Sequence, residues 1–425
     1  MSARSARRAA RAPHGTLAFV ESPVQLLNVL EWAHLAAPPT TAEAALPTAA
    51  DAEAAASTAA DAEAAASTAA DAERALSTAA GSEPAPGDLT LVVLAPTDPM
   101  TRGQLRRMAE LARAEGHTVR WEEARGGTTA PFHTIGGLAG PLRRAARIVI
   151  GDPFSRYVQL LLTITRAQDL VVVDDGTATM EFISQLANGE RLVRWHRRGG
   201  RPGPRDMVFL PVSSSARRRL TPHPKGSRRV EVFSSMPIDA APEGVHVTVN
   251  SFAWTRARFG PPRITKGADL VGTSLVETGV VDLDRYLEAV GALARTHGAA
   301  RYFAHRRESA EKLHRLAVET GLQVIRPDLP LELIARRGPI GRVILSFPST
   351  VVHTLPLALA GTEVKVAVMD IDPAWLTDKA SPRAQGFLSG VTGTARDVHR
   401  LAALQHPDPA PALPTQPTRQ TPAPA

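Results

Sequence analysis

The 425-residue sequence predicts an α/β protein built from two doubly wound halves. Short apolar, β-branched runs alternate with amphipathic stretches of helix length, which is typical of chains of βαβ units. Runs such as residues 170–173 are apolar at every position, as in strands of a parallel sheet covered on both faces. The chain is long enough to bury more than one large core. A break at residues 242–244 divides it into domains predicted at 14–240 and 245–400.

The elements follow from this alternation of apolar runs and amphipathic stretches. In the first half we expect strands at residues 17–20, 89–95, 118–121, 147–150 and 170–173, with helices at 23–34, 99–115 and 177–186. In the second half we expect a strand near 268–272, a second strand that ends at Ala304, and further strands at 323–325, 343–345 and 364–368. We expect helices there at 283–296, 310–320, 331–336 and 351–360.

Three biased segments are expected to lie outside these domains. Residues 1–13 form a basic arm, and residues 406–425 contain seven prolines and are typical of a disordered tail. Residues 36–88 form a low-complexity insertion with a decapeptide that starts at Thr48, recurs at Thr58 and returns imperfectly at Thr68. A period of ten matches no repeat long enough to bury a core.

The composition excludes several classes of protein. Without cysteine, a disulfide framework, a Cys-ligated metal site and a thiol nucleophile are excluded. No run approaches 18 apolar residues, and the basic N-terminus lacks a following apolar stretch, so we expect neither a membrane span nor a secretory signal. We therefore expect a cytoplasmic protein.

The net charge of +7 comes largely from one segment near the end of the first half. Residues 191–229 hold twelve Lys and Arg residues against a single acid, Asp206. One interpretation is a solvated loop. The other is a surface that attracts an anionic acceptor, or the inner face of a membrane as a peripheral contact.

Open parallel sheets bind ligands at the carboxyl ends of their strands, so residues directly after strands are the candidates. Asp174, Asp175 and Gly176 follow one such strand. An aspartate there is a candidate general base when burial or a neighbouring charge raises its pKa. The alternative is that the pair caps the next helix. The sequence contains neither a Gly-x-Gly-x-x-Gly fingerprint nor a Walker A motif.

His305 and Arg306 follow a strand of the second half. A histidine there can hydrogen-bond an anionic leaving group, and Arg306 adds positive potential for a phosphate. The alternative is a solvated polar turn in which Glu308 pairs with an arginine.

Ser349 and Thr350 precede the helix predicted at 351–360, where hydroxyls and free N–H groups form an anion site. Ser22 and Gln25 follow the first strand and are candidates for contact with a hydroxylated acceptor. For both pairs the alternative is a helix cap.

Residues 19–28, with the sequence FVESPVQLLN, then Asp174-Asp175-Gly176, His305 and Ser349-Thr350, resemble in this order the bacterial sialyltransferases, in particular the polysialyltransferase-like family of capsule biosynthesis. The resemblance covers roughly residues 16–375, apart from the repeat insertion. It implies a GT-B architecture, with two Rossmann-like domains facing a central cleft. It also implies inverting transfer of sialic acid from CMP-sialic acid to a glycan hydroxyl, with no cofactor and no required metal.

The resemblance further implies a role for each matched residue. Asp174 would be the general base, with Asp175 and Gly176 shaping its turn. His305 would assist the departing CMP, and Ser349 and Thr350 would bind its phosphate. One departure stands out, because the family has proline where this chain has Arg306.

Two alternatives to this function remain at the level of sequence. One is a GT-B transferase or epimerase that uses a UDP-sugar. The other is a non-catalytic binder of polyanions with degenerate transferase motifs. A nucleic-acid partner is not expected, because no helix–turn–helix or aromatic-interleaved basic signature is present.

Overall fold

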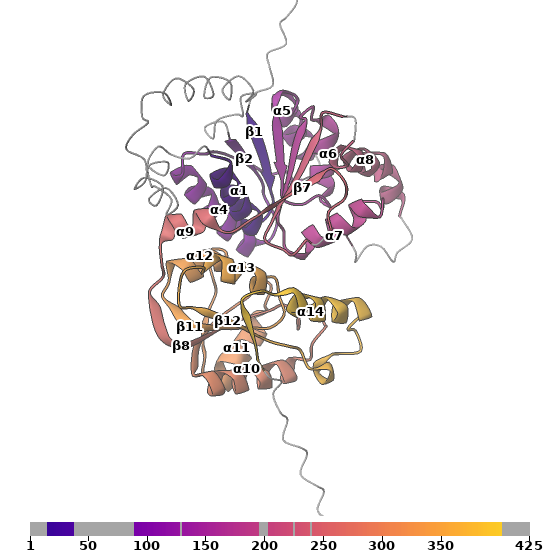
Figure 1. Ribbon diagram of the computed structural model, residues 1–425. Helices are drawn as coiled ribbons and strands as arrows, with labels where there is room; N and C mark the ends of the chain where they lie inside the picture. Colours follow the sequence, from indigo (N-terminus) through magenta and orange to yellow (C-terminus); the bar gives the residue numbers. More distant parts are fainter. Residues whose placement is uncertain are drawn as a thin grey trace, which may run out of the picture.

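A computed structural model of the chain describes residues 15–37, 89–127, 130–194, 203–223, 226–238 and 240–401. The predicted basic arm, most of the repeat insertion and the proline-rich tail lie outside the described residues. The remaining chain forms two α/β domains stacked end to end (Figure 1).

The first domain contains a seven-stranded sheet in the order β3-β2-β1-β4-β5-β6-β7. Every neighbouring pair of these strands is parallel. Its strands are β1 (Thr16–Val20), β2 (Leu89–Leu94), β3 (Thr118–Glu122), β4 (Arg147–Ile150), β5 (Asp169–Val173), β6 (Arg229–Ser234) and β7 (Val245–Val249). Its helices are α1 (Pro23–Ala36), α4 (Pro99–Ala114), α5 (Ala130–Arg144), α6 (Arg156–Ile164), α7 (Thr177–Ala187) and α8 (Pro204–Leu220).

The second domain contains a six-stranded parallel sheet in the order β10-β9-β8-β11-β12-β13. Its strands are β8 (Ile264–Val271), β9 (Ala299–Phe303), β10 (Gln323–Ile325), β11 (Ile340–Ser346), β12 (Lys365–Met369) and β13 (Val398–Leu401). Its helices are α10 (Leu283–His297), α11 (Ala310–Thr320), α12 (Leu331–Arg337), α13 (Val351–Ala358), the 3-10 turn η3 (Pro373–Trp375) and α14 (Pro382–Thr394).

Both sheets have the doubly wound strand order, in which the chain starts at a central strand, moves outward and then returns past it. The two-domain α/β architecture predicted from the sequence, which is of the GT-B type, is therefore confirmed. The order reverses between β1 and β4 in the first sheet and between β8 and β11 in the second. These switch points are where open α/β sheets bind ligands.

Both faces of the sheets are buried, which explains the unbroken apolar strands. In β1, Ala18 and Val20 pack with residues of α1 and α4, whereas Phe19 packs on the other face with residues of α5, α6 and α7. In β8, Leu270 joins the α10 and α11 side and Val271 joins the side of α12 and α13. Helices therefore cover each sheet on both sides.

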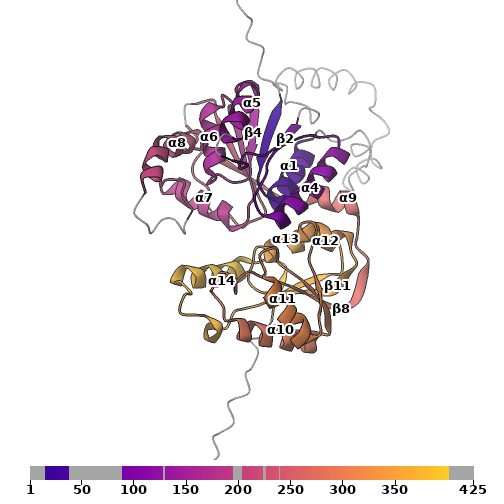
Figure 2. The same ribbon diagram turned by 180° about the vertical axis from the view of Figure 1, so that it is seen from behind.

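The boundary predicted at residue 245 is wrong by one strand. β7 pairs with β6 in the first sheet, and its exposed edge position leaves it without the apolar run that the core strands show. The chain leaves the first domain through α9 (Ala253–Phe259), beside both domains in Figures 1 and 2. Glu31 of α1 accepts hydrogen bonds from the Trp254 and Thr255 N–H groups and so holds α9 against the first domain.

Helix α8 carries the basic cluster at Arg217, Arg218 and Arg219. It packs on α6 at the outer side of the first domain, away from the second domain (Figures 1 and 2). Arg219 donates to the Ala167 carbonyl oxygen, so part of this charge stabilises the domain itself. Within the described ranges, no helix combines the length and the hydropathy needed to span a bilayer.

Candidate active site

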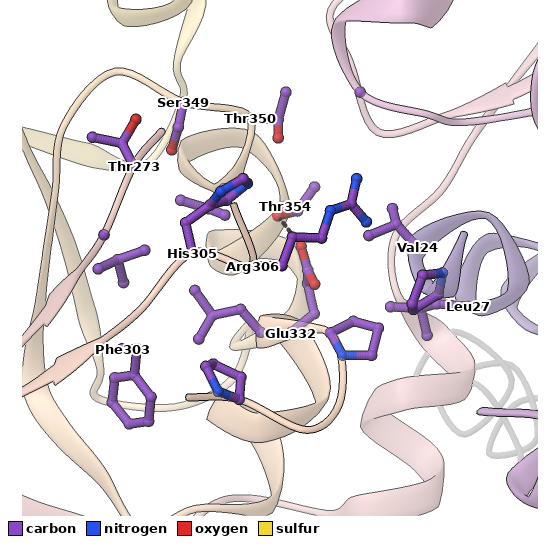
Figure 3. A pocket seen from close by; sticks show the side chains of 18 of the residues that line it. Val24, Leu27, Thr273, Phe303, His305, Arg306, Glu332, Ser349, Thr350 and Thr354 are labelled. Atoms are coloured by element: carbon purple, nitrogen blue, oxygen red, sulfur yellow. Dashed lines mark hydrogen bonds between the residues drawn. The ribbon is translucent and has the colours of Figure 1, made fainter. Parts of the chain in front are cut away.

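A cavity of about 350 Å³ lies between the two domains. Its walls are the carboxyl ends of β5, β8, β9 and β11, together with the start of α1 (Figure 3). Of the sequence-predicted site residues, the cavity brings together Asp174, Asp175, Gly176, His305, Arg306, Ser349 and Thr350. Ser22 and Gln25 are not among its lining residues. The switch points of both sheets thus open into the same space.

Asp174 is the buried member of the carboxylate pair, with 2% of its surface exposed. Its Oδ1 accepts from Gly176 N at 3.1 Å and from Thr179 Oγ1 at 2.7 Å. Its Oδ2 accepts from Ser235 N at 3.2 Å and Ser235 Oγ at 2.9 Å. Burial raises the pKa of Asp174, and these hydrogen bonds act against the rise. Both oxygens are already engaged by the protein, which ties the turn after β5 to the turn after β6.

Asp175 also lines the cavity, and its carboxylate has fewer close hydrogen-bond partners than that of Asp174. Its Oδ2 lies 3.5 Å from Nη2 of Arg194, which is closer to Asp152 at 2.7 Å. Burial, and then the nearby Asp152 carboxylate, raise the pKa of Asp175 to about 7. Arg194, Arg306 and a hydrogen bond from Gln25 limit the rise. A carboxyl group with a pKa near neutrality can accept a proton from a substrate.

Gly176 closes the turn with a positive φ of 65° at the start of α7. A Cβ atom at this position would lie 2.9 Å from Cγ2 of Thr350 in the second domain. Glycine therefore satisfies two requirements, the left-handed backbone and the close approach of the opposite domain. The Asp-Asp-Gly turn and the Ser-Thr turn meet across the cavity.

His305 is neutral and has a defined tautomer. Its Nδ1 accepts from the Arg307 backbone N–H at 3.2 Å, which leaves the proton on Nε2. Burial, followed by the charges of Arg306, Arg307 and Lys312, lowers the pKa of His305 to about 4. The imidazole can therefore donate a hydrogen bond to an anion at neutral pH without carrying a charge.

A buried polar network supports the His305 turn from below. Glu308 Oε2 accepts from the His305 N–H at 2.5 Å, and Oε1 accepts from Tyr302 at 2.6 Å. Lys312, 1% exposed, lies 2.8 Å from the same Oε1 and donates to the Thr273 carbonyl oxygen at 2.9 Å. The alternative of a solvated turn is wrong, because the carboxylate that pairs there is buried with a lysine and not exposed with an arginine.

Ser349 and Thr350 lie between β11 and α13. Thr350 is the N-cap residue of α13, but its side chain makes no capping hydrogen bond. Ser349 Oγ lies 3.5 Å from Ser346 Oγ, at the limit of a hydrogen bond. Both hydroxyls line the cavity beside the first N–H groups of the helix, which suits an anion better than a simple helix cap.

Arg306 is the one Lys or Arg among the described residues that line the cavity. Figure 3 shows its guanidinium directed toward Val24 of α1, while the His305 ring lies on the side of Ser349. Its charge limits the rise in the pKa of Asp175, and it adds to the hydrogen bonds from Thr101 that lower the pKa of Asp98; both aspartates belong to the first domain. Arg306 thus extends from the second domain across the cavity.

Ser22 and Gln25 support the site from behind. Ser22 Oγ accepts from the Gln25 N–H at 3.2 Å and caps α1, as its alternative interpretation predicted. The Gln25 side chain accepts from the Glu21 N–H at 2.8 Å, packs against Gly151 and hydrogen-bonds Asp175. Gln25 therefore contacts Asp175 without lining the cavity.

The structure adds a buried carboxyl group that sequence reasoning missed. Glu332 lines the cavity from α12, is 5% exposed, and accepts from Thr354 Oγ1 at 2.6 Å (Figure 3). Burial raises the pKa of Glu332. No local motif marks this residue, since it lies within an amphipathic helix. Its remaining hydrogen-bonding capacity suits hydroxyl or amino groups of a ligand.

The described ranges hold no group of three or more His, Asp or Glu side chains arranged to bind a metal ion. No protein-family model matches the sequence, and no curated protein matches it. Among solved structures, the α/β-galactoside α-2,3-sialyltransferase of the luminous marine bacterium Photobacterium phosphoreum is similar, with 8% sequence identity and a TM-score of 0.42. The match covers 91% of this chain and 98% of that chain. A likeness this distant assigns no role to any residue.

Proposed function

We propose that the protein is an inverting glycosyltransferase that moves an acidic sugar from a CMP-activated donor, with CMP-sialic acid as the leading candidate, to a glycan hydroxyl. The observation that carries this proposal is the cavity itself. Its lining includes Asp175 of the first domain, whose carboxyl group has a pKa of about 7, and the neutral hydrogen-bond donor His305 of the second. The candidate anion site of the second domain lines the same cavity. The order of the matching sequence motifs supports the same reaction.

Asp175 is the base in this proposal, in place of Asp174. The acceptor hydroxyl attacks the anomeric carbon while Asp175 takes its proton. The bond from that carbon to the phosphate oxygen breaks, and the nucleotide leaves with the electron pair. The products are the glycoside, CMP and a protonated Asp175. Asp174 is unsuited to this task, because the protein already engages both of its oxygens.

The second domain holds the leaving group. Ser349, Thr350 and the N-terminus of α13 bind the phosphate, and His305 donates from Nε2 to the oxygen that gains charge. Arg306 supplies positive charge beside an acidic donor. Because His305 is neutral, it stabilises the departing phosphate as a hydrogen-bond donor and not as a general acid. The acceptor side faces the first domain, and neither step uses a metal ion.

Nucleotide binding and donor turnover test this function. We expect CMP to raise the melting temperature of the full chain and UDP to leave it unchanged, since only a ligand of the folded state stabilises it. We expect CMP release from CMP-sialic acid to depend on an oligosaccharide acceptor and to yield a glycoside detectable by mass spectrometry. If UDP stabilises the protein and a UDP-sugar is turned over, the donor is a UDP-sugar and not a CMP-sugar. If the protein binds polyanions and turns over neither donor, the proposal that it is a glycosyltransferase is wrong.

A further inference from the structure

Asp152 and Asp175 share one arginine at the edge of the candidate site. The two carboxylates follow β4 and β5, which are neighbours in the sheet, so their side chains emerge side by side. Arg194 follows α7, and its Nη2 lies 2.7 Å from Asp152 and 3.5 Å from Asp175. Asp152 is 7% exposed and is not among the residues that line the cavity, nor is Arg194.

The sharing is unequal. Arg194 makes a short, charge-assisted hydrogen bond to Asp152 and only a marginal one to Asp175. Asp152 also accepts from the Phe154 N–H at 2.9 Å, so its carboxylate is fixed in place. Among the described residues, Arg306 from the second domain and Gln25 from α1 also act on Asp175. The negative charge of Asp152 is therefore paired with Arg194, whereas the negative charge of Asp175 is only partly paired.

We propose that Asp152 and Arg194 are positioning residues of the transfer reaction, which set the proton affinity of Asp175 by dividing one guanidinium between two carboxylates. The inference rests on the proposed function for its catalytic meaning. Arg194 pairs mainly with Asp152, and the Asp152 carboxylate places a second negative charge near Asp175. Both effects favour the protonated form of Asp175.

Two substitutions are expected to shift the pKa of Asp175 in opposite directions. Asp152→Asn removes a like charge and releases Arg194 to pair with Asp175, so both consequences weaken proton binding. Arg194→Gln removes a cation and leaves Asp152 uncompensated beside Asp175, so proton binding strengthens. A residue that merely supports the fold would shift both titrations alike, or neither. Opposite signs show that both charges act on Asp175, as their opposite charges require.

The test is a carboxyl titration of the full chain labelled with 13C at the aspartate side chains, with Asp175→Asn assigning the signal. We expect a midpoint near pH 7 in the wild type, consistent with the pKa of about 7 for Asp175. We expect proton binding about tenfold weaker or more in Asp152→Asn, and about tenfold stronger or more in Arg194→Gln.

Asp169→Asn is the matched control. Asp169 pairs with Arg229 at 2.7 Å at the opposite end of β5, so the variant removes an equal charge from the same strand. We expect the Asp175 midpoint to remain in place. Arg194→Lys retains a cation and serves as the second variant if Arg194→Gln does not fold, with a midpoint expected closer to that of the wild type. Shifts of one sign in both main variants, or no shift in either, overturn the proposal.

The titration is measured on the protein without a nucleotide sugar. It therefore tests the effect of Asp152 and Arg194 on Asp175 separately from the proposed function. Absence of transfer with every nucleotide sugar would refute the proposed function, whatever the titration shows. If transfer occurs, the acidic limb of kcat/KM should move with the Asp175 midpoint in each variant. A limb that stays fixed while the midpoint moves would show that Asp152 and Arg194 do not act on the reaction.

Discussion

Asp174 and Asp175 follow the same strand, but their carboxyl groups serve different purposes. Asp174 is surrounded by donors from its own turn and from Ser235 after β6. Asp175 lines the cavity too, but its carboxylate competes with Asp152 for Arg194. The first arrangement stabilises the fold, and the second leaves a carboxyl able to accept a proton.

We expect Asp174→Ala to lower the free energy of unfolding by about 2–4 kcal/mol, because Thr179 and Ser235 lose a buried acceptor. Asp175→Ala should change it by less than about 1 kcal/mol, since that side chain is poorly compensated. Chemical denaturation of both variants measures the difference. Equal losses in the two variants would contradict the separate roles.

The pH dependence of the reaction reports on Asp175. The base acts when ionised, and its pKa is about 7. We therefore expect kcat/KM to fall about tenfold for each pH unit below 7 and to level off above it. His305, with a pKa of about 4, stays neutral and adds no limb between about pH 5 and 9. An activity that is flat from about pH 5 to 7 would exclude Asp175 as the base.

The sequence placed this pair at a strand end and the resemblance assigned the base to Asp174, whereas we propose Asp175. The choice depends on Ser235, Asp152 and Arg194, which other strands and helices bring to the same edge. Glu332 went unnoticed for a similar reason, because its burial at the cavity results from packing between the domains. Motif order predicts which turns meet, and the tertiary contacts decide what each side chain does there.

At the scale of elements, the starts of α7 and α13 meet through Gly176 and Thr350. A side chain at residue 176 would collide with the Thr350 methyl group, in a backbone conformation that only glycine adopts readily. The two turns can approach this closely because one of them lacks a Cβ atom.

We expect Gly176→Ala to lower kcat/KM at least tenfold by separating the two turns. Adding Thr350→Ser, which removes the colliding methyl, should recover part of the loss. Gly189→Ala is the matched control, since Gly189 has a φ of 66° at the other end of α7 and does not contact the second domain. Steady-state kinetics and denaturation of the three variants measure this. Equal loss of activity in Gly189→Ala would indicate backbone strain alone.

The support of the His305 turn can be tested in the same way. We expect Lys312→Met to cost about 3–5 kcal/mol, because it leaves Glu308 buried without its cation. Adding Glu308→Gln should reduce that cost, since the uncompensated charge is then removed. Denaturation of the single and double variants gives the coupling. Additive losses would show that the two charges do not depend on each other.

Most strands and the helices between them were predictable from apolar periodicity. Helices α5, α6, α8, α9 and α14 and strands β6 and β13 were not predicted. Pro141 and Pro211 interrupt α5 and α8, and α8 has little amphipathic pattern. β7 was missed because it is an edge strand that needs no continuous apolar run. These gaps moved the domain boundary without changing the position of the site.

At the scale of the whole molecule, the proposed reaction is divided between two domains. The domains touch at the cavity wall, where Gln104 donates to the Pro327 carbonyl oxygen at 2.8 Å, and outside the cavity, where Arg107 pairs with Asp328. Helix α9 packs on α1 and on α12, so it links the domains at one side. An arrangement of this kind assembles the site and excludes water when the domains close around a donor.

The proposed division of labour follows the order of the motifs along the chain, since two of the four lie in each half. The basic segment was less informative, because α8 lies away from the cavity and uses part of its charge within the domain. Contact of this surface with an anionic acceptor or a membrane remains a prediction.

In the proposed reaction, Asp175 removes the acceptor proton while the second domain binds the nucleotide. The most direct measurement compares wild type and Asp175→Asn for acceptor-dependent transfer from CMP-sialic acid and for CMP affinity by calorimetry. We predict that the variant loses about 10²–10⁴-fold in kcat, as expected for removal of a general base, with CMP affinity unchanged. Transfer at the wild-type rate in Asp175→Asn would contradict the claim.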